Sequence, residues 1–276
     1  MGREKHFVKL KLDIIFKKVF GDKDNKEALA SLLSALLEIP MEEIGEITLD
    51  NVEMPPEMYE TKFSRLDLKL TLDGRVIDIE IQITNQEDFK ERSLFYWAKM
   101  FSKNLKAGDE YKKLPQTICI NIINFNMFDC EDYLSTFEIF EKSRHERLTD
   151  RLSINFFELK KVGKYPKNKP MDEWLTLINA ESEEDLMSIE KNTTNEAIKN
   201  VVVKLREYNA DERVQLQAEI REEALHEEAS RLASAMNEGI AKGRAEEKKK
   251  NIEQFISNLK AMGLTENQIS EATKNI

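Results

Sequence analysis

The strongest constraint on the fold is a pair of alternating polar and apolar stretches, RLDLKLTL and RVIDIEIQ, which flank Asp73-Gly74. A period of two is typical of a β-strand with one buried face, and Asp-Gly is a frequent two-residue turn between antiparallel strands. In a hairpin with this turn Leu72 pairs with Arg75, and six aliphatic residues then fall on one face. These residues are Leu66, Leu68, Leu70, Ile77, Ile79 and Ile81.

The opposite face of this predicted hairpin carries an acidic pair. Counting back from the turn places Asp67 opposite Glu80, with Gln82 on the same face. Lys69 and Asp78 are expected to form a cross-strand ion pair there. Opposed residues have Cβ atoms about 4.5–5.5 Å apart, and two like charges at that spacing destabilise a strand pair unless a cation such as Mg²⁺ binds both. Geometry alone leaves two interpretations open, a metal site or a solvated polar face with an incidental carboxylate pair.

The rest of the N-terminal half indicates a mixed α/β core. Two helical stretches within the first forty residues are followed by a strand at about residues 44–53. A helix at about residues 87–106 follows the hairpin, and the apolar stretch TICINIINF at 117–125 is typical of a buried central strand. A last strand is expected at residues 153–161. The predicted order is therefore helices, three strands, a helix and two strands.

After a Pro- and Lys-rich bend the chain is predicted to be almost entirely helical. We place the α/β core at residues 1–163 and a helical region at 164–276. The tail is expected to form a helical hairpin, with Gly263 ending one helix and Thr265 capping the next. This tail resembles a helix-turn-helix, but it has few basic residues, so self-association is favoured over DNA readout.

Apolar positions along residues 196–250 need a partner surface, which is the chain's own core, the terminal hairpin or a second copy. We favour a second copy, and hence a homodimer or higher homo-oligomer. The apolar periodicity drifts at residues 209–213, which argues against one uninterrupted coiled coil. The apolar positions are Val201, Leu205, Leu216, Ile220, Leu232, Met236 and Ile240.

Composition narrows the functional classes. The formal net charge of −10 excludes a basic protein that coats nucleic acid, although local cationic clusters remain compatible with a DNA-acting enzyme. Two cysteines without a CxxC motif fit a reducing compartment, and the N-terminus lacks the apolar segment of a secretory signal. No apolar stretch has the length of a membrane span, and no phosphate-binding glycine motif occurs. We therefore expect a cytoplasmic protein with no membrane partner and no nucleotide cofactor.

The string RLDLKLTLDGRVIDIEIQ resembles the core of the Rpn family of recombination-promoting nucleases, which are transposase-like members of the PD-(D/E)XK nuclease superfamily. The resemblance extends upstream to LDIIFKKVFGDKDNKEALASLLSALL and downstream to ERSLFYWAKMFSKNLKAGDEYKKLPQTICINIINF and LSINFFELKK, which together cover about residues 8–160. The segment EGIAKGRAEEKKK is similar in style to the C-terminal region of that family.

This resemblance implies a restriction-endonuclease-like fold and a DNA endonuclease that uses Mg²⁺, with Mn²⁺ as a substitute. Asp67 matches the first core acid of the family and Glu80 the second, so both are expected to bind the metal. Gln82 is the usual residue of this family at a position where many PD-(D/E)XK enzymes have lysine, and Lys69 is a candidate to replace the missing charge. The implied setting is DNA recombination, mobile-element movement or defence.

Three further residues are candidates for the site. Asp13 lies on the first predicted helix, where such folds often supply a third metal-binding acid, although it is also compatible with a solvated helix residue. Arg92 and Tyr96 share one face of the helix after the hairpin, where Tyr96 is equally compatible with core packing. The alternative function is a catalytically inactive DNA-binding or assembly module that acts through the helical C-terminal region. A helical scaffold with a vestigial α/β core is a third possibility.

Overall fold

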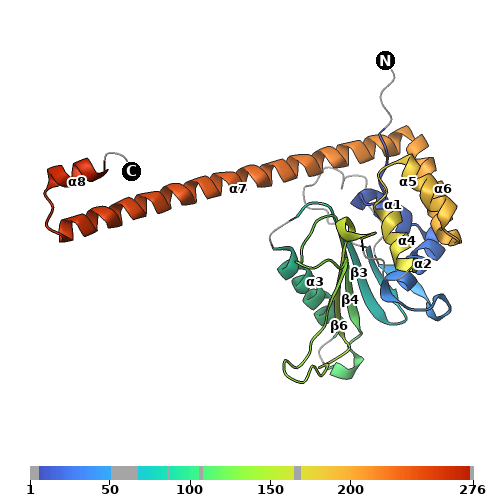
Figure 1. Cartoon of the computed structure of the whole chain (residues 1–276). Helices are drawn as coiled ribbons and strands as arrows, with labels where there is room; N and C mark the ends of the chain where they lie inside the picture. The colour runs from blue at the N-terminus through green and yellow to red at the C-terminus, as the bar shows by residue number, and fades with distance from the viewer. Residues whose placement is uncertain (1–5, 51–67, 86–87, 106–107, 165–168, 274–276) are drawn as a thin grey trace, which may run out of the picture. The chain divides into compact units, whose positions relative to one another are not determined.

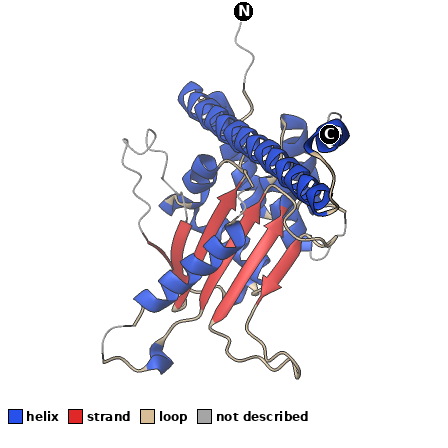
Figure 2. Ribbon diagram, turned by 90° about the vertical axis from the view of Figure 1, so that its left-hand side faces the viewer, coloured by secondary structure: helices blue, strands red, loops and turns tan. Residues whose placement is uncertain are grey.

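The computed structural model describes residues 6–50, 68–85, 88–105, 108–164 and 169–273. Within these residues a mixed sheet of six strands, in the order β1-β2-β3-β4-β6-β5, has helices on both faces (Figures 1 and 2). The arrangement confirms the predicted mixed α/β core. The strands are β1 (Ile47–Asp50), β2 (Leu68–Leu72), β3 (Arg75–Gln82), β4 (Thr117–Ile123), β5 (Leu134–Phe137) and β6 (Leu152–Glu158).

The predicted hairpin forms between β2 and β3. Its register runs from Leu72 opposite Arg75 to Leu68 opposite Ile79, as the sequence predicts. Asp73 and Gly74 have φ values of 47° and 75°, which is the pair of positive angles that a type I′ turn requires. The described aliphatic residues of the predicted face are all buried, so the alternation in the sequence correctly identifies the core side.

The centre of the sheet is parallel. Helix α3 (Phe89–Lys103) connects β3 to β4, and both β3 and β6 pair in parallel with β4. All seven residues of β4 are buried, as expected for a central strand covered on both faces. Sequence reasoning missed β5, a four-residue edge strand that pairs antiparallel with β6 and has two exposed residues. Its burial pattern lacks the strict alternation that reveals a longer strand.

Helices cover the two faces unequally. Within the described residues α3 covers one face, whereas several helices pack on the other (Figures 1 and 2). Trp174 is fully buried in this second layer, 5.7 Å from the ring of Phe20, and its indole nitrogen donates to the hydroxyl of Ser31. The predicted helices after residue 164 thus complete the core that begins at the N-terminus. The layer contains α1 (Asp13–Phe20), α2 (Lys26–Leu37), α4 (Lys169–Ile178), α5 (Glu183–Asn192) and α6 (Glu196–Ala210).

The chain divides into two compact units, Met1–Leu225 and His226–Ile276, whereas the sequence predicts a boundary at 163/164. The difference arises because α4 and α6 pack against α2 and, with α5, join the same hydrophobic cluster as the N-terminal helices instead of forming a separate one. The start of α7 (Glu212–Ala261) belongs to the first unit, where Val214 and Ala218 are buried. Asp211 caps α7 by accepting from the backbone N–H of Arg213, which explains the predicted break in periodicity.

The second unit contains the rest of α7 and the short helix α8 (Glu266–Thr273). Gly263 has a φ of 84° and ends α7, and the side chain of Gln268 accepts from the backbone N–H of Thr265. The turn between the two helices thus lies at Gly263 and Thr265, where the sequence predicts it. Among the described residues, no helix combines the length and apolar character that crossing a membrane requires.

An ion pair between Asp22 and Lys204 ties the loop after α1 to α6, with the ammonium 2.7 Å from the carboxylate. Hydrogen bonds from Lys204 and from the backbone of Asp24 lower the pKa of Asp22 below its ordinary value of 3.8. Its contribution to stability is therefore complete above that value and is lost as the pH falls through the lowered pKa. Asp22→Asn is expected to reduce the free energy of unfolding at pH 7 by about 1 kcal/mol or less, the usual range for ion pairs near the protein surface. Urea unfolding at pH 7 and at pH 3 checks this, because the difference from the wild type should shrink at the lower pH.

Candidate functional site

Strand β3 presents its polar side chains to α3 and its isoleucines to the helical core. The isoleucines pack into the larger hydrophobic cluster, whereas Asp78, Glu80 and Gln82 alternate with them on the other face. Asp78 is 4% exposed and Glu80 is 6% exposed. Carboxylates buried to this degree need positive charge or hydrogen-bond donors nearby. The face of the sheet beneath α3 is therefore one place in the described core where charged groups are buried.

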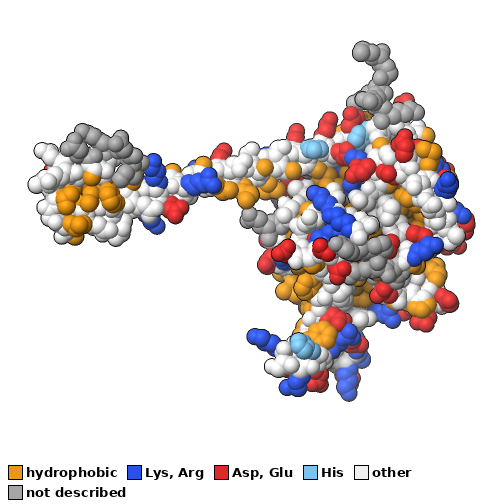
Figure 3. Space-filling view, viewed as in Figure 1, with side chains coloured by type: hydrophobic (Ala, Val, Ile, Leu, Met, Phe, Trp, Pro, Cys, Tyr) orange, Lys and Arg blue, Asp and Glu red, His pale blue; other side chains and the backbone are white. Residues whose placement is uncertain are grey.

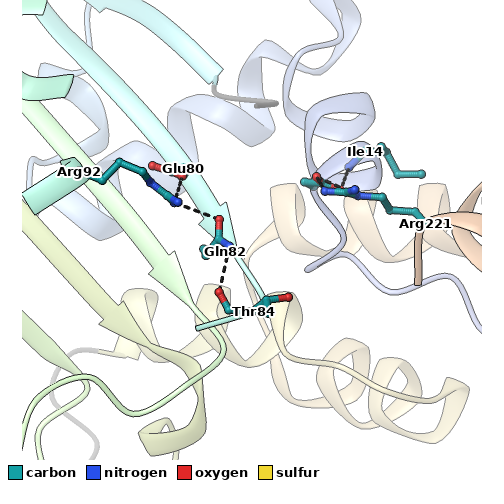
Figure 4. Close-up of polar contacts among 7 residues, drawn as sticks. Ile14, Glu80, Gln82, Thr84, Arg92 and Arg221 are labelled. Carbon is teal, nitrogen blue, oxygen red and sulfur yellow. Dashed lines mark hydrogen bonds and ion pairs between the residues drawn. The ribbon is translucent and has the colours of Figure 1, made fainter. Parts of the chain in front are cut away.

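Arg92, from the first turn of α3, supplies such a charge (Figure 4). One guanidinium nitrogen, Nη2, lies 2.7 Å from Glu80 Oε1 and 3.2 Å from Gln82 Oε1. The amide nitrogen of Gln82 in turn donates to the carbonyl of Thr84. Arg92 is 8% exposed, and its guanidinium lies 4.5 Å from the centre of the Phe89 ring. The acid and the amide of the predicted ExQ pair are thus held by a single buried cation.

A second set of polar contacts holds α3 against the sheet beside this site. Asn121 of β4 is the register partner of Glu80 and is 2% exposed. Its side-chain oxygen accepts from the hydroxyl of Ser93, and its amide nitrogen donates to the carbonyl of Asn155. Ser93 directly follows Arg92, so this contact fixes the part of α3 that carries the guanidinium.

Asp13 has a different partner. Its carboxylate accepts hydrogen bonds from the guanidinium of Arg221 on α7 and from the backbone N–H of Ile14. In Figure 4 Ile14 and Arg221 form a group apart from Glu80 and Arg92. The Asp13 side chain is 13% exposed. The ion pair with Arg221 accounts for the charge of this acid in the described structure.

A family model described as PD-(D/E)XK nuclease family transposase matches residues 10–235 of this chain. The match covers most of the 276 residues. The chain belongs to this family. No curated protein and no solved structure matches it.

Membership of the PD-(D/E)XK nuclease family confirms the resemblance on which the sequence interpretation rests. It also identifies the mixed sheet with its flanking helices as a restriction-endonuclease-like α/β fold. The associated function is of the nuclease type, with DNA as the implied substrate, and enzymes of this superfamily generally use divalent metal ions.

The predicted first acid of the family pattern, Asp67, lies outside the described residues. The part of the chain that the structure describes holds no group of three or more His, Cys, Asp or Glu residues able to bind a metal. The donors that are described nevertheless suit a hard divalent cation, because the polar face of β3 offers carboxylate oxygens from Asp78 and Glu80 and an amide oxygen from Gln82. The site residues present therefore fit the class of metal that the family uses.

The remaining sequence candidates occupy distinct positions. Lys69 is exposed on β2 and pairs in register with Asp78, which lies two residues nearer the turn than Glu80. Tyr96 is half-buried on α3, with its ring 5.8 Å from that of Phe95. Roles for Lys69 and Tyr96 in the reaction stay predictions.

Sequence reasoning missed Ser93 and Asn121. The available signal was weak, since Asn121 is a polar residue inside the apolar stretch TICINII, and Ser93 lies within a helix of mixed composition. A polar residue in the middle of a fully buried strand requires a hydrogen-bond partner. The sequence alone does not reveal which element supplies it.

Proposed function

We propose that this chain is a divalent-metal-dependent DNA endonuclease with its reaction centre at Asp67, Glu80 and Gln82. Mg²⁺ is the proposed ion, and Mn²⁺ is expected to substitute for it. The main support is the buried carboxylate of Glu80 on an ExQ strand of a PD-(D/E)XK nuclease family member, next to a buried guanidinium. The family resemblance further suggests a role in DNA recombination, mobile-element movement or defence.

In this proposal Asp67 and Glu80 hold the metal. A metal ion bound there would lower the pKa of a coordinated water and polarise the scissile phosphate. Gln82 carries no charge. Its amide is held between Arg92 and the carbonyl of Thr84, so Gln82 would help to orient the coordinated water. Asp13 remains the predicted third acid, and its ion pair with Arg221 would have to open before it could bind a metal.

A plasmid assay tests this proposal. Purified protein is incubated with supercoiled DNA in Mg²⁺, in Mn²⁺ and in EDTA, and nicked or linear products are quantified. Cleavage in either metal that EDTA abolishes supports the endonuclease. Retarded DNA in a gel-shift experiment without cleavage in either metal would instead favour the binding or assembly module. Catalysis independent of metal would contradict the proposed chemistry.

We further propose that the chain self-associates through exposed apolar positions of the helical C-terminal region, most of which lie in the second unit. Of the apolar positions that need a partner, Val201 and Leu205 are buried in the chain's own core, whereas the others are exposed. Hydrophobic side chains are also exposed at the end of the second unit (Figure 3). A second copy that covers these positions would give two reaction centres for two DNA strands. The exposed positions are Leu216, Ile220, Leu232, Met236 and Ile240, followed by Phe255 and Met262.

Light scattering after size exclusion measures this association. The full chain is expected to be a dimer or larger at micromolar concentration, and a chain ending at Leu225 is expected to be a monomer, because it lacks most of the exposed positions. A monomeric full chain, or a stable dimer of the shortened chain, would contradict the assignment.

The two free cysteines, Cys119 and Cys130, suit the reducing cytoplasm in which we expect the protein to act.

A further inference from the structure

We infer that Arg92 supplies, from helix α3, the positive charge that a lysine on the ExK strand supplies in many PD-(D/E)XK enzymes. This inference rests on the proposed endonuclease function. Gln82 cannot carry charge, so a reaction centre with a neutral residue at this position needs a cation from elsewhere in the fold to stabilise the phosphate. The Arg92 guanidinium contacts both Glu80 and Gln82, which places it at the residue that lacks the charge.

The alternative source that the sequence suggests is less well placed. Lys69 is exposed, and its register partners are Asp50 on one side and Asp78 on the other. Arg92 is buried, and a charge in a region of low dielectric constant acts more strongly on a neighbouring anion than a solvated one does. Arginine also stays protonated at any working pH and matches the geometry of phosphate oxygens.

The surroundings of Arg92 hold the guanidinium in place before any substrate arrives. The Phe89 ring lies on one side of it, and the hydrogen bond from Ser93 to Asn121 fixes the adjacent residue of α3 against β4. Preorganised charges of this kind contribute most to catalysis, because they need no reorganisation when negative charge develops on the phosphate. A buried ion pair often stabilises a fold no more than apolar side chains of similar volume do. A purely structural role is therefore a poor explanation for a charged residue at position 92.

Because Arg92 lies beside Glu80, its charge is expected to favour cleavage but to weaken metal binding. Arg92 and a divalent cation would both be attracted to the Glu80 carboxylate, and they would repel each other. Loss of the arginine is therefore expected to strengthen metal binding while it slows cleavage. A residue that only maintained the shape of the site would weaken both when replaced, so the two roles give different results.

The test compares full-length wild type with Arg92→Gln and with the double variant Arg92→Gln/Gln82→Lys. Arg92→Gln is expected to cleave plasmid DNA about 100-fold more slowly or worse, as when one preorganised donor is removed from other enzymes. Its affinity for Mn²⁺, measured by calorimetry, is expected to rise by several-fold. The double variant is expected to regain at least about tenfold in rate, because it restores a cation next to Glu80. Lys99→Gln removes a charge from an exposed position of the same helix and should change neither quantity.

The inference would be overturned if Arg92→Gln cleaved DNA at the wild-type rate, or if a folded double variant did not regain any cleavage rate. If Arg92→Gln loses its cooperative thermal unfolding transition, Arg92→Lys and Arg92→Met provide the comparison, since their side chains are long and differ in charge. A faster Arg92→Lys then supports the inference, and equal rates contradict it. If the wild type itself cleaves no DNA, the proposed function fails, while Mn²⁺ affinity still shows whether Arg92 faces a metal site.

Discussion

Glu80→Gln is expected to reduce metal-dependent DNA cleavage by about three orders of magnitude. The substitution keeps the size of the side chain and leaves an oxygen that can accept from Arg92, but it removes the negative charge that binds the metal. Metal-ion catalysis contributes several kcal/mol, and each loss of about 1.4 kcal/mol slows a reaction tenfold. Glutamine is a better test than alanine, because alanine would also remove the oxygen that accepts from Arg92, and truncating one partner of a buried ion pair costs about 3–5 kcal/mol in stability.

The matched control is Glu91→Gln, which makes the same chemical change at an exposed position next to Arg92 in the sequence. Initial rates of plasmid nicking in Mg²⁺ and Mn²⁺ should be unchanged in this variant. Asp67→Ala is expected to behave like Glu80→Gln, since the hairpin register predicts Asp67 opposite Glu80. If a folded Glu80→Gln protein cleaved DNA at the wild-type rate, β3 could not be part of the reaction centre.

The hairpin was predictable because its determinants are local. Alternation fixes the buried face of each strand, and the Asp73-Gly74 turn fixes the register, so the position of Lys69 opposite Asp78 in the strand register follows from the sequence alone. The placement of Gln82 beside Glu80 on the polar face follows in the same way. The predicted partner of Glu80 across the hairpin, Asp67, lies outside the described residues.

The contacts made by α3 were not predictable to the same degree. Spacing along the helix indicates which of its residues share a face, but not how the helix is rotated on the sheet. That rotation depends on the crossover from β3 to β4 and on the contact between Ser93 and Asn121. Arg92 was therefore a candidate from the sequence, whereas its joint contact with Glu80 and Gln82 emerges only from the assembled fold.

The helical region shows the limit of composition as a guide to domains. The Pro- and Lys-rich composition after Val162 and the helical pattern that follows suggest an independent unit, but many apolar residues of α4, α5 and α6 are buried in the same cluster as the N-terminal helices. Trp174 and Leu205 are examples, with 0% and 1% exposure. Amphipathic helices reveal which face is buried and not which surface covers it.

A chain that ends at residue 163 is accordingly expected not to fold, whereas one that ends at Leu225 is expected to unfold cooperatively. The shorter chain lacks α4, α5 and α6 and exposes the surface of α2 on which α4 and α6 pack. Each large apolar side chain that is lost from the core contributes about 1.5–3 kcal/mol, and several such losses exceed the roughly 5–15 kcal/mol by which most domains are stable. The buried residues removed include Trp174, Leu175, Leu177, Ile178, Ile198, Val201, Val202 and Leu205.

Urea unfolding followed by circular dichroism distinguishes these two chains. The chain ending at Leu225 retains the larger hydrophobic cluster, because the buried start of α7 at Val214 and Ala218 is included. Its transition should be sigmoidal, with a slope appropriate to its size, whereas the chain ending at residue 163 should show a broad change or aggregate. A sigmoidal transition in the shorter chain, with a midpoint close to that of the longer one, would show that the α/β core is stable without the helices that cover α2.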